Sequence, residues 1–121
     1  MKIAVSATDK NLEANVDQRF GRCKYFLMVN TESMNYEAVS NENSIASGGA
    51  GIKAAETVVN NGAEILITGN IGPNAHRTLS AGGVKIYTGA KGTVKDAIKS
   101  YKNNELDETE NPNVKSHHGM R

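Results

Sequence analysis

The sequence has little cysteine, proline or aromatic residue, and these shortages exclude several classes of protein. Of its 121 residues, one is cysteine, two are proline, none is tryptophan and 5% are aromatic. A single thiol forms no disulfide within the chain and cannot supply an all-cysteine zinc or iron–sulfur site, so we expect a reducing, cytoplasmic setting. No apolar run approaches the roughly 20 residues of a membrane helix, and the chain begins with a strand pattern and no charged-then-apolar leader. We therefore expect no membrane partner and no secretion.

An excess of charge of one sign is also missing. The chain carries 14 basic and 13 acidic side chains, for a net charge of +1. Nucleic-acid binders usually present a strongly basic face, so we expect no nucleic-acid partner. The length suits one core and is too short for two. Hydrophobic residues make up 38% and occur in short dense runs, which indicates a folded domain.

Short apolar runs and helical spacing alternate along the chain and predict an α/β fold. Residues 3–6 and 65–67 are typical of buried strands. Residues 25–29 and 36–39 are separated by a short polar break, which predicts an antiparallel hairpin. The remaining elements are expected as helices over residues 52–59, 73–81 and 94–101 and a strand over 84–87. The order βββαβαβα implies parallel strands with right-handed crossovers in the second half.

The domain organisation follows from a change of composition near the end of the chain. Residues 1–102 carry the alternating pattern and are predicted to form one α/β domain. After Tyr101 the composition turns polar and acidic, so residues 103–121 are predicted to be a flexible polar tail.

The 12 glycines concentrate in loops, and two of these loops precede predicted helices. Backbone N–H groups at a helix start, together with the helix dipole, form an anion site. Neither segment is a Walker loop or a dinucleotide fingerprint, since the required lysine and glycine spacing are absent. Ligands in open α/β sheets lie beyond the carboxyl ends of the strands, so we expect these loops to line one pocket. Ordinary turns that need glycine are the alternative. The candidate binding residues are Gly48, Gly49, Gly51, Gly69, Asn70, Gly72, Asn74 and Gly89.

Cys23 is a candidate ligand because a thiolate binds soft metals and metal–sulfur clusters. Arg22 and Lys24 flank it, and Arg19 lies four residues before it. Positive neighbours would favour the thiolate, and the guanidinium groups of both arginines would attract an anionic cofactor. The alternatives are a buried apolar cysteine and solvated arginines that pair with a nearby carboxylate such as Asp17.

The end of the chain carries further candidate metal ligands, His117, His118 and Met120. Two imidazoles and a thioether suit copper, and imidazole also suits zinc, nickel or iron. The alternatives are a tail with incidental histidines and a tail that caps a cluster held near Cys23. His76 could face the pocket from its predicted helix, although an ordinary helix-surface histidine explains it as well.

Five segments together are similar to one family: residues 3–5, 19–26, 48–51, 67–75 and 87–90. Over residues 1–101 the chain resembles a small stand-alone member of the dinitrogenase iron–molybdenum cofactor biosynthesis family. The resemblance implies a ribonuclease-H-like mixed sheet of five strands in the order 3-2-1-4-5, with strand 2 antiparallel and helices on both faces. It also implies a metal–sulfur cluster of iron, molybdenum or copper as the bound cofactor.

These observations together predict a non-catalytic carrier of a metal–sulfur cluster or iron–molybdenum cofactor precursor. Its partners would be the cluster, a cluster donor and a cluster acceptor, with the carrier a monomer or weak homodimer. No Ser–His–Asp set or acid pair is apparent, and residues 3–6 lack the carboxylates of a two-metal nuclease. One alternative is an enzyme or sensor that binds a small anionic ligand at the glycine-rich loops. Another is an interaction module that pairs through an edge strand of the hairpin.

Overall fold

The computed structural model describes residues 1–42 and 49–112 and contains one mixed sheet. The five strands lie in the order β3-β2-β1-β4-β5. β1 pairs antiparallel with β2 and parallel with β4, while β2 and β3 form the predicted antiparallel hairpin. The strands are β1 (Lys2–Ala7), β2 (Tyr25–Asn30), β3 (Tyr36–Ser40), β4 (Ile65–Ile67) and β5 (Lys85–Tyr87). The predicted strand order and the antiparallel second strand are confirmed.

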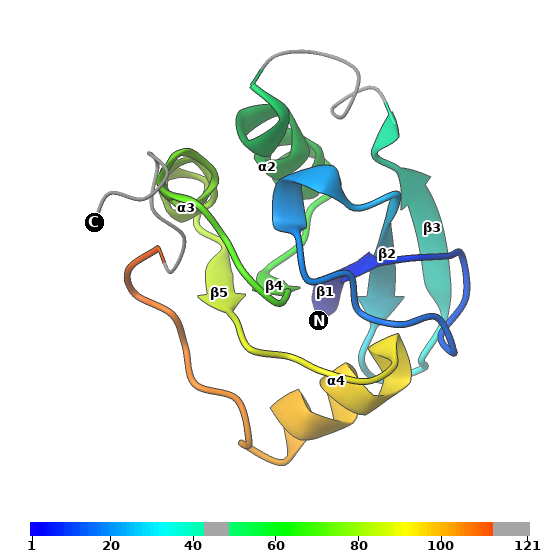
Figure 1. Cartoon of the computed structure of the whole chain (residues 1–121). Coiled ribbons are helices and arrows are strands. Elements are labelled where there is room, and N and C mark those ends of the chain that lie inside the picture. The colour runs from blue at the N-terminus through cyan, green and yellow to red at the C-terminus, as the bar shows by residue number, and fades with distance from the viewer. Residues whose placement is uncertain (43–48, 113–121) are drawn as a thin grey trace.

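Helices cover both faces of the sheet, as predicted (Figure 1). α2 (Ala50–Asn60) and α3 (Pro73–Ala81) lie side by side on one face. α4 (Val94–Lys102) lies on the other face, and a short 3-10 helix η1 (Phe20–Arg22) follows the long loop after β1. No helix in residues 1–42 or 49–112 is long and apolar enough to cross a membrane.

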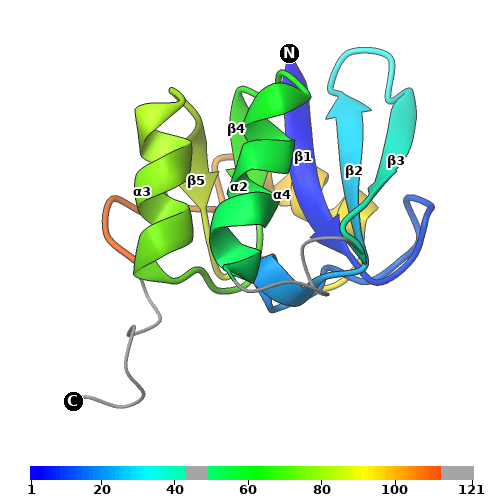
Figure 2. The same ribbon diagram turned by 90° about the horizontal axis from the view of Figure 1, so that it is seen from above.

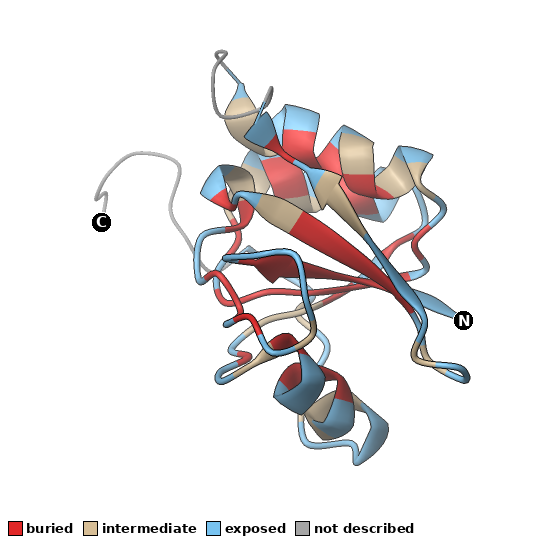
Figure 3. Cartoon of the chain, turned by 90° about the vertical axis from the view of Figure 1, so that its right-hand side faces the viewer, coloured by how far each residue is buried: buried red, intermediate tan, exposed pale blue. Residues whose placement is uncertain are grey.

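The core has two layers because successive strand side chains point to opposite faces of a sheet. In β1, Ala4 belongs to the cluster under α2 and α3, whereas Ile3 and Val5 belong to the cluster under α4. All three residues of β4 are buried, which is why this strand is uninterruptedly apolar in sequence. Figure 3 shows the buried residues running through the sheet between the two helical layers. The parallel strands β1, β4 and β5 lie side by side, so their carboxyl ends meet at one edge of the sheet.

The N-terminus of α4 is capped by side chains of its own N-cap residue and first turn. The Thr93 Oγ1 atom accepts a hydrogen bond from the Asp96 backbone N at 3.0 Å, and the Thr93 N donates to Asp96 Oδ2 at 3.1 Å. These bonds from Thr93 lower the pKa of the Asp96 carboxyl. The first-turn donors of this helix are thus partly satisfied by a capping box. The other two helices begin differently, and that difference creates the site described below.

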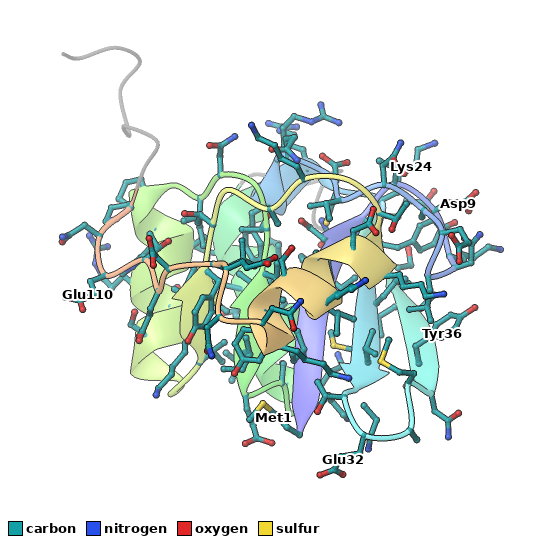
Figure 4. The ribbon with its side chains drawn as sticks, turned by 90° about the horizontal axis from the view of Figure 1, so that it is seen from below. Met1, Asp9, Lys24, Glu32, Tyr36 and Glu110 are labelled. Atoms are coloured by element: carbon teal, nitrogen blue, oxygen red, sulfur yellow. The ribbon has the colours of Figure 1, made fainter. Side chains whose placement is uncertain are left out.

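The first part of the predicted flexible tail is held against the domain. Glu108 forms an antiparallel bridge with Tyr87, and the Thr109 N donates to the Ile86 O at 2.6 Å. The Thr109 O lies 3.1 Å from His76 Nε2. This part of the predicted polar tail is therefore bonded to the domain, because its backbone covers the open edge of β5. Glu110 follows beside α3 and is directed outward (Figure 4). Residues 113–121 lie outside the described residues.

Candidate functional site

A pocket of about 580 Å³ opens at the edge where the parallel strands end. η1 and the first turns of α2 and α3 lie together at this edge (Figure 2). The lining residues are Gln18, Arg19, Phe20, Gly21, Arg22, Gly49, Gly51, Ile52, Asn70, Gly72, Pro73, Asn74 and Ala75. The predicted meeting of the two glycine-rich loops in one pocket is confirmed, and the loop after β1 lines the pocket with them. The loop after β5, which carries the predicted Gly89, does not line it.

Two helix N-termini face this pocket, and each has a glycine, which carries no capping side chain, as its N-cap residue. The N-cap residues are Gly49 for α2 and Gly72 for α3, and neither first turn contains an acidic residue. Gly49 adopts φ +74°, a left-handed conformation that favours glycine. The first N–H groups of a helix have no partner within the helix and carry the positive end of its dipole. Two such ends in one pocket provide a backbone site for an anion.

Glycines allow the three segments to approach closely. A Cβ on Gly21 would lie 3.1 Å from the Gly51 Cα, so η1 rests directly on the first turn of α2. A Cβ on Gly69 would lie 2.6 Å from the Gln18 Cα. Gly69 therefore does not line the pocket as predicted; it lets the loop after β1 lie against the loop after β4.

Backbone hydrogen bonds lock these loops together. The Asn70 N donates to the Gln18 O at 2.9 Å, and the Phe20 N donates to the Asn70 O at 3.3 Å. The Gln18 Nε2 donates to the Ala90 O at 3.0 Å, which ties in the loop after β5. Gly89, in that loop, adopts φ +81° and serves the turn without lining the pocket. The pocket is thus built mainly from backbone that three strands hold in place.

The pocket combines positive charge with apolar walls. Arg19 and Arg22 line it, and no ion pair of Arg22 occurs in the part of the chain that the structure describes. The Arg19 Nε atom lies 3.5 Å from Asp17 Oδ1, with 71% of the Arg19 side chain exposed. Ile52 and Pro73 contribute apolar surface, whereas the ring of Phe20 is buried against Phe26. Guanidinium groups beside apolar walls suit a weakly hydrated anion better than a small, strongly hydrated one.

Cys23 lies outside the pocket and inside the core. Its exposed fraction is 0%, and it belongs to the apolar cluster under α2 and α3. The Asn41 Nδ2 donates to the Cys23 O at 2.9 Å and lies 3.7 Å from Sγ. Burial, and then the negative charge of Asp17, raise the pKa of the Cys23 thiol. Of the two interpretations of Cys23, the structure agrees with the buried apolar cysteine. The neighbouring Lys24 is exposed and points outward (Figure 4).

The sequence model of the dinitrogenase iron-molybdenum cofactor family matches residues 1–104. The chain belongs to this family. A curated relative, an uncharacterized protein of Methanocaldococcus jannaschii, is 29% identical over 113 residues, which cover 91% of this chain and 92% of that protein. The family resemblance of the sequence is thereby confirmed.

Solved structures of similar proteins share the whole domain. The apo form of the orange protein from Desulfovibrio gigas superposes with a TM-score of 0.90 at 36% identity, covering 93% of this chain and 95% of that one. A Thermotoga protein of the DUF35 family, determined by NMR, gives a TM-score of 0.78 at 40% identity, with 90% and 93% covered. The fold described above is therefore shared by experimentally determined structures.

The predicted binding residues of this family member divide into three groups. Those that line the pocket are Arg19, Arg22, Gly49, Gly51, Asn70, Gly72 and Asn74. Cys23, Gly69 and Gly89 lie elsewhere, while Gly48, His117, His118 and Met120 lie outside the described residues. The other lining residues were not named among the predicted binding residues: Gln18, Phe20, Gly21, Ile52, Pro73 and Ala75. Each lies within four positions of a residue that was named, and this closeness in sequence is the signal that could have found them.

The described ranges contain no group of three or more histidine, cysteine, aspartate or glutamate side chains placed to hold a metal ion. His76 is half-buried against Thr109 and does not line the pocket, which agrees with the ordinary helix-surface interpretation. The chemistry that the described site offers is therefore hydrogen-bond donation and positive charge.

The buried thiol gives the protein a specific response to alkaline pH. Below the pKa of an unfolded cysteine, about 8.5, both states keep the proton and stability is unaffected. Above it the unfolded chain loses the proton while folded Cys23 keeps it, so the free energy of unfolding falls with pH, by up to about 1.4 kcal/mol per pH unit. Denaturant unfolding at pH 8 and pH 10 should show a loss that is about 1–2 kcal/mol larger in the wild type than in Cys23→Ala. Equal losses in the two proteins would contradict the buried thiol.

Proposed function

We propose that this protein is a non-catalytic carrier of an anionic metal–sulfur cluster, such as a precursor of the iron–molybdenum cofactor. The observation that carries the proposal is the meeting of two uncapped helix N-termini and two arginines in one pocket. N–H and guanidinium groups are donors only, so they bind the sulfide or oxide atoms of a cargo and do not coordinate a bare cation. A cluster that brings its own sulfide ligands fits this donor set.

The size and walls of the pocket support a cargo of several heavy atoms. Its volume of about 580 Å³ falls within the range of small-molecule sites, and a single oxyanion fills only a small part of it. Ile52 and Pro73 would contact polarisable sulfide without leaving a polar group unpaired. The donors around them are backbone N–H groups fixed by helices, so little reorganisation accompanies binding.

The family and its neighbours support the same cargo class. The family description names the dinitrogenase iron–molybdenum cofactor, and the orange protein structure is described as an apo form. An apo form implies that the orange protein also exists with a bound group. The proposal for this chain includes a protein that donates the cluster and a protein that accepts it. It also includes that the carrier is a monomer or a weak homodimer.

The proposal is tested on untagged protein isolated without oxygen. Stoichiometric iron, molybdenum or copper with acid-labile sulfide and a visible charge-transfer band is the expected result. Metal-free protein is then titrated with tetrathiomolybdate, a dianion of molybdenum and sulfide, in parallel with molybdate and phosphate. Uptake of the thio-anion, with Arg19→Gln/Arg22→Gln weakened by at least tenfold, supports the carrier. Isolated protein without metal, no uptake, and thermal stabilisation by nucleotides or sugar phosphates would instead favour the small-ligand enzyme or sensor.

A further inference from the structure

Asp17 is a buried carboxylate that immediately precedes Gln18 and Arg19, two residues that line the pocket. Its side chain is 8% exposed, and Oδ1 accepts a hydrogen bond from the Arg19 backbone N at 3.0 Å. The Asp17 N donates to the Ser6 O at 2.9 Å, and the Ser6 Oγ donates to the Asp17 O at 2.8 Å. Asp17 is therefore fixed to the end of β1, while its charge faces the arginine that lines the pocket.

The backbone of Arg19 is fixed, whereas its side chain is held at one point. Gln18 and Phe20 on either side are both bonded to Asn70. The guanidinium approaches Asp17 only through Nε, at 3.5 Å, and 71% of the side chain is exposed. A single long contact of an exposed arginine is weak, and the carboxylate keeps its bond to the Arg19 N when the guanidinium leaves. The side chain can thus turn without any change in the loop.

We propose that Asp17 is an internal counter-ion for Arg19, which the anionic cargo displaces on binding. The inference rests on the proposed function and concerns how that site gains and loses its cargo. Without cargo, the carboxylate offsets the charge of Arg19 and holds the guanidinium beside the pocket. A multiply charged anion beside the two helix N-termini attracts Arg19 more strongly than one long contact does. When the cargo leaves, Asp17 takes the guanidinium back, which favours release to an acceptor.

A double-mutant cycle separates this exchange from simple charge repulsion. Asp17→Asn keeps an oxygen that can accept from the Arg19 N and removes only the charge. Tetrathiomolybdate affinity is measured for wild type, Asp17→Asn, Arg19→Gln and the double variant at one low salt concentration. We expect Asp17→Asn to tighten binding by about three- to tenfold in the wild type and by less than about twofold when Arg19 is already replaced. The exposed Glu13→Gln variant carries the same charge change in the same loop and should alter affinity by less than about twofold.

If Asp17→Asn tightens tetrathiomolybdate binding equally with and without Arg19, the proposed displacement of Arg19 from Asp17 is wrong. The proposal that the protein carries a cluster would not be affected. Failure of the wild type to bind tetrathiomolybdate would overturn the carrier and the exchange with it. If Asp17→Asn does not fold, the displacement can still be tested by NMR on the wild type. The NMR signal of the Arg19 Nε–H should move with the same affinity as the pocket amides. A signal that stays unchanged at saturating tetrathiomolybdate would overturn the displacement of Arg19 from Asp17.

Discussion

Replacing Gly72 by aspartate is expected to stabilise the fold slightly and to weaken cargo binding strongly. Gly72 is the N-cap of α3 with φ −89°. Among the described residues, and apart from its two chain neighbours, no atom lies within 4 Å of the place where its Cβ would stand. An aspartate there can accept a hydrogen bond from the first-turn N–H groups and suits the helix dipole, adding about 0.3–1 kcal/mol. The same carboxylate competes with the cargo for those groups. We expect a higher melting temperature together with tetrathiomolybdate binding weakened by roughly 10- to 100-fold.

The matched control for this variant is Gly72→Ala. Alanine fits the same open space and has no acceptor, so binding should stay within about threefold of the wild type. Thermal unfolding and a spectroscopic titration on the two variants and the wild type provide both quantities. If Gly72→Asp binds as tightly as Gly72→Ala, the cargo does not use the start of α3.

Replacing Gly69 by alanine is expected to destabilise the whole domain by about 2–3 kcal/mol. The added Cβ would lie 2.6 Å from the Gln18 Cα, a backbone atom that cannot rotate away. The loops after β1 and β4 would have to separate, and the hydrogen bond from the Asn70 N to the Gln18 O would weaken. Urea unfolding of Gly69→Ala and Gly72→Ala measures the effect, because both add one methyl group to the same loop.

The comparison of Gly69→Ala with Gly72→Ala tests two further points. Gly69→Ala should also weaken tetrathiomolybdate binding, since the parted loops carry Arg19 and Asn70. A loss of stability below about 0.5 kcal/mol in Gly69→Ala relative to Gly72→Ala would show that these loops do not pack as described.

The sheet and much of the pocket could be predicted from the sequence because both depend on local patterns. The apolar runs of β1 and β4 mark central strands, and the short polar break between β2 and β3 marks a hairpin. Glycine at the start of a helix, as at Gly49 and Gly72, identifies uncapped N-termini without knowledge of tertiary contacts. The ribonuclease-H-like name for this sheet stays a prediction.

The other features depend on contacts between distant parts of the chain. Gly69 and Gly72 are chemically identical, and only the approach of Gln18 makes one structural and the other part of the pocket. The basic neighbours of Cys23 suggested a thiolate, but the thiol is buried in the core and its pKa is raised. The acidic composition around Thr109 suggested a free tail, although backbone bonding to the edge of β5 does not depend on side-chain character.

An NMR titration of amide signals with tetrathiomolybdate tests the central claim most directly. The account predicts saturable shifts at the first-turn amides of both helices, Gly51 and Ile52 in α2 and Asn74 and Ala75 in α3, with those of η1 following. All should give one affinity, with little change in α4, whose start is already capped. Unchanged amides in both helix starts, or shifts confined to the surroundings of Cys23, would contradict a site built from helix N-termini.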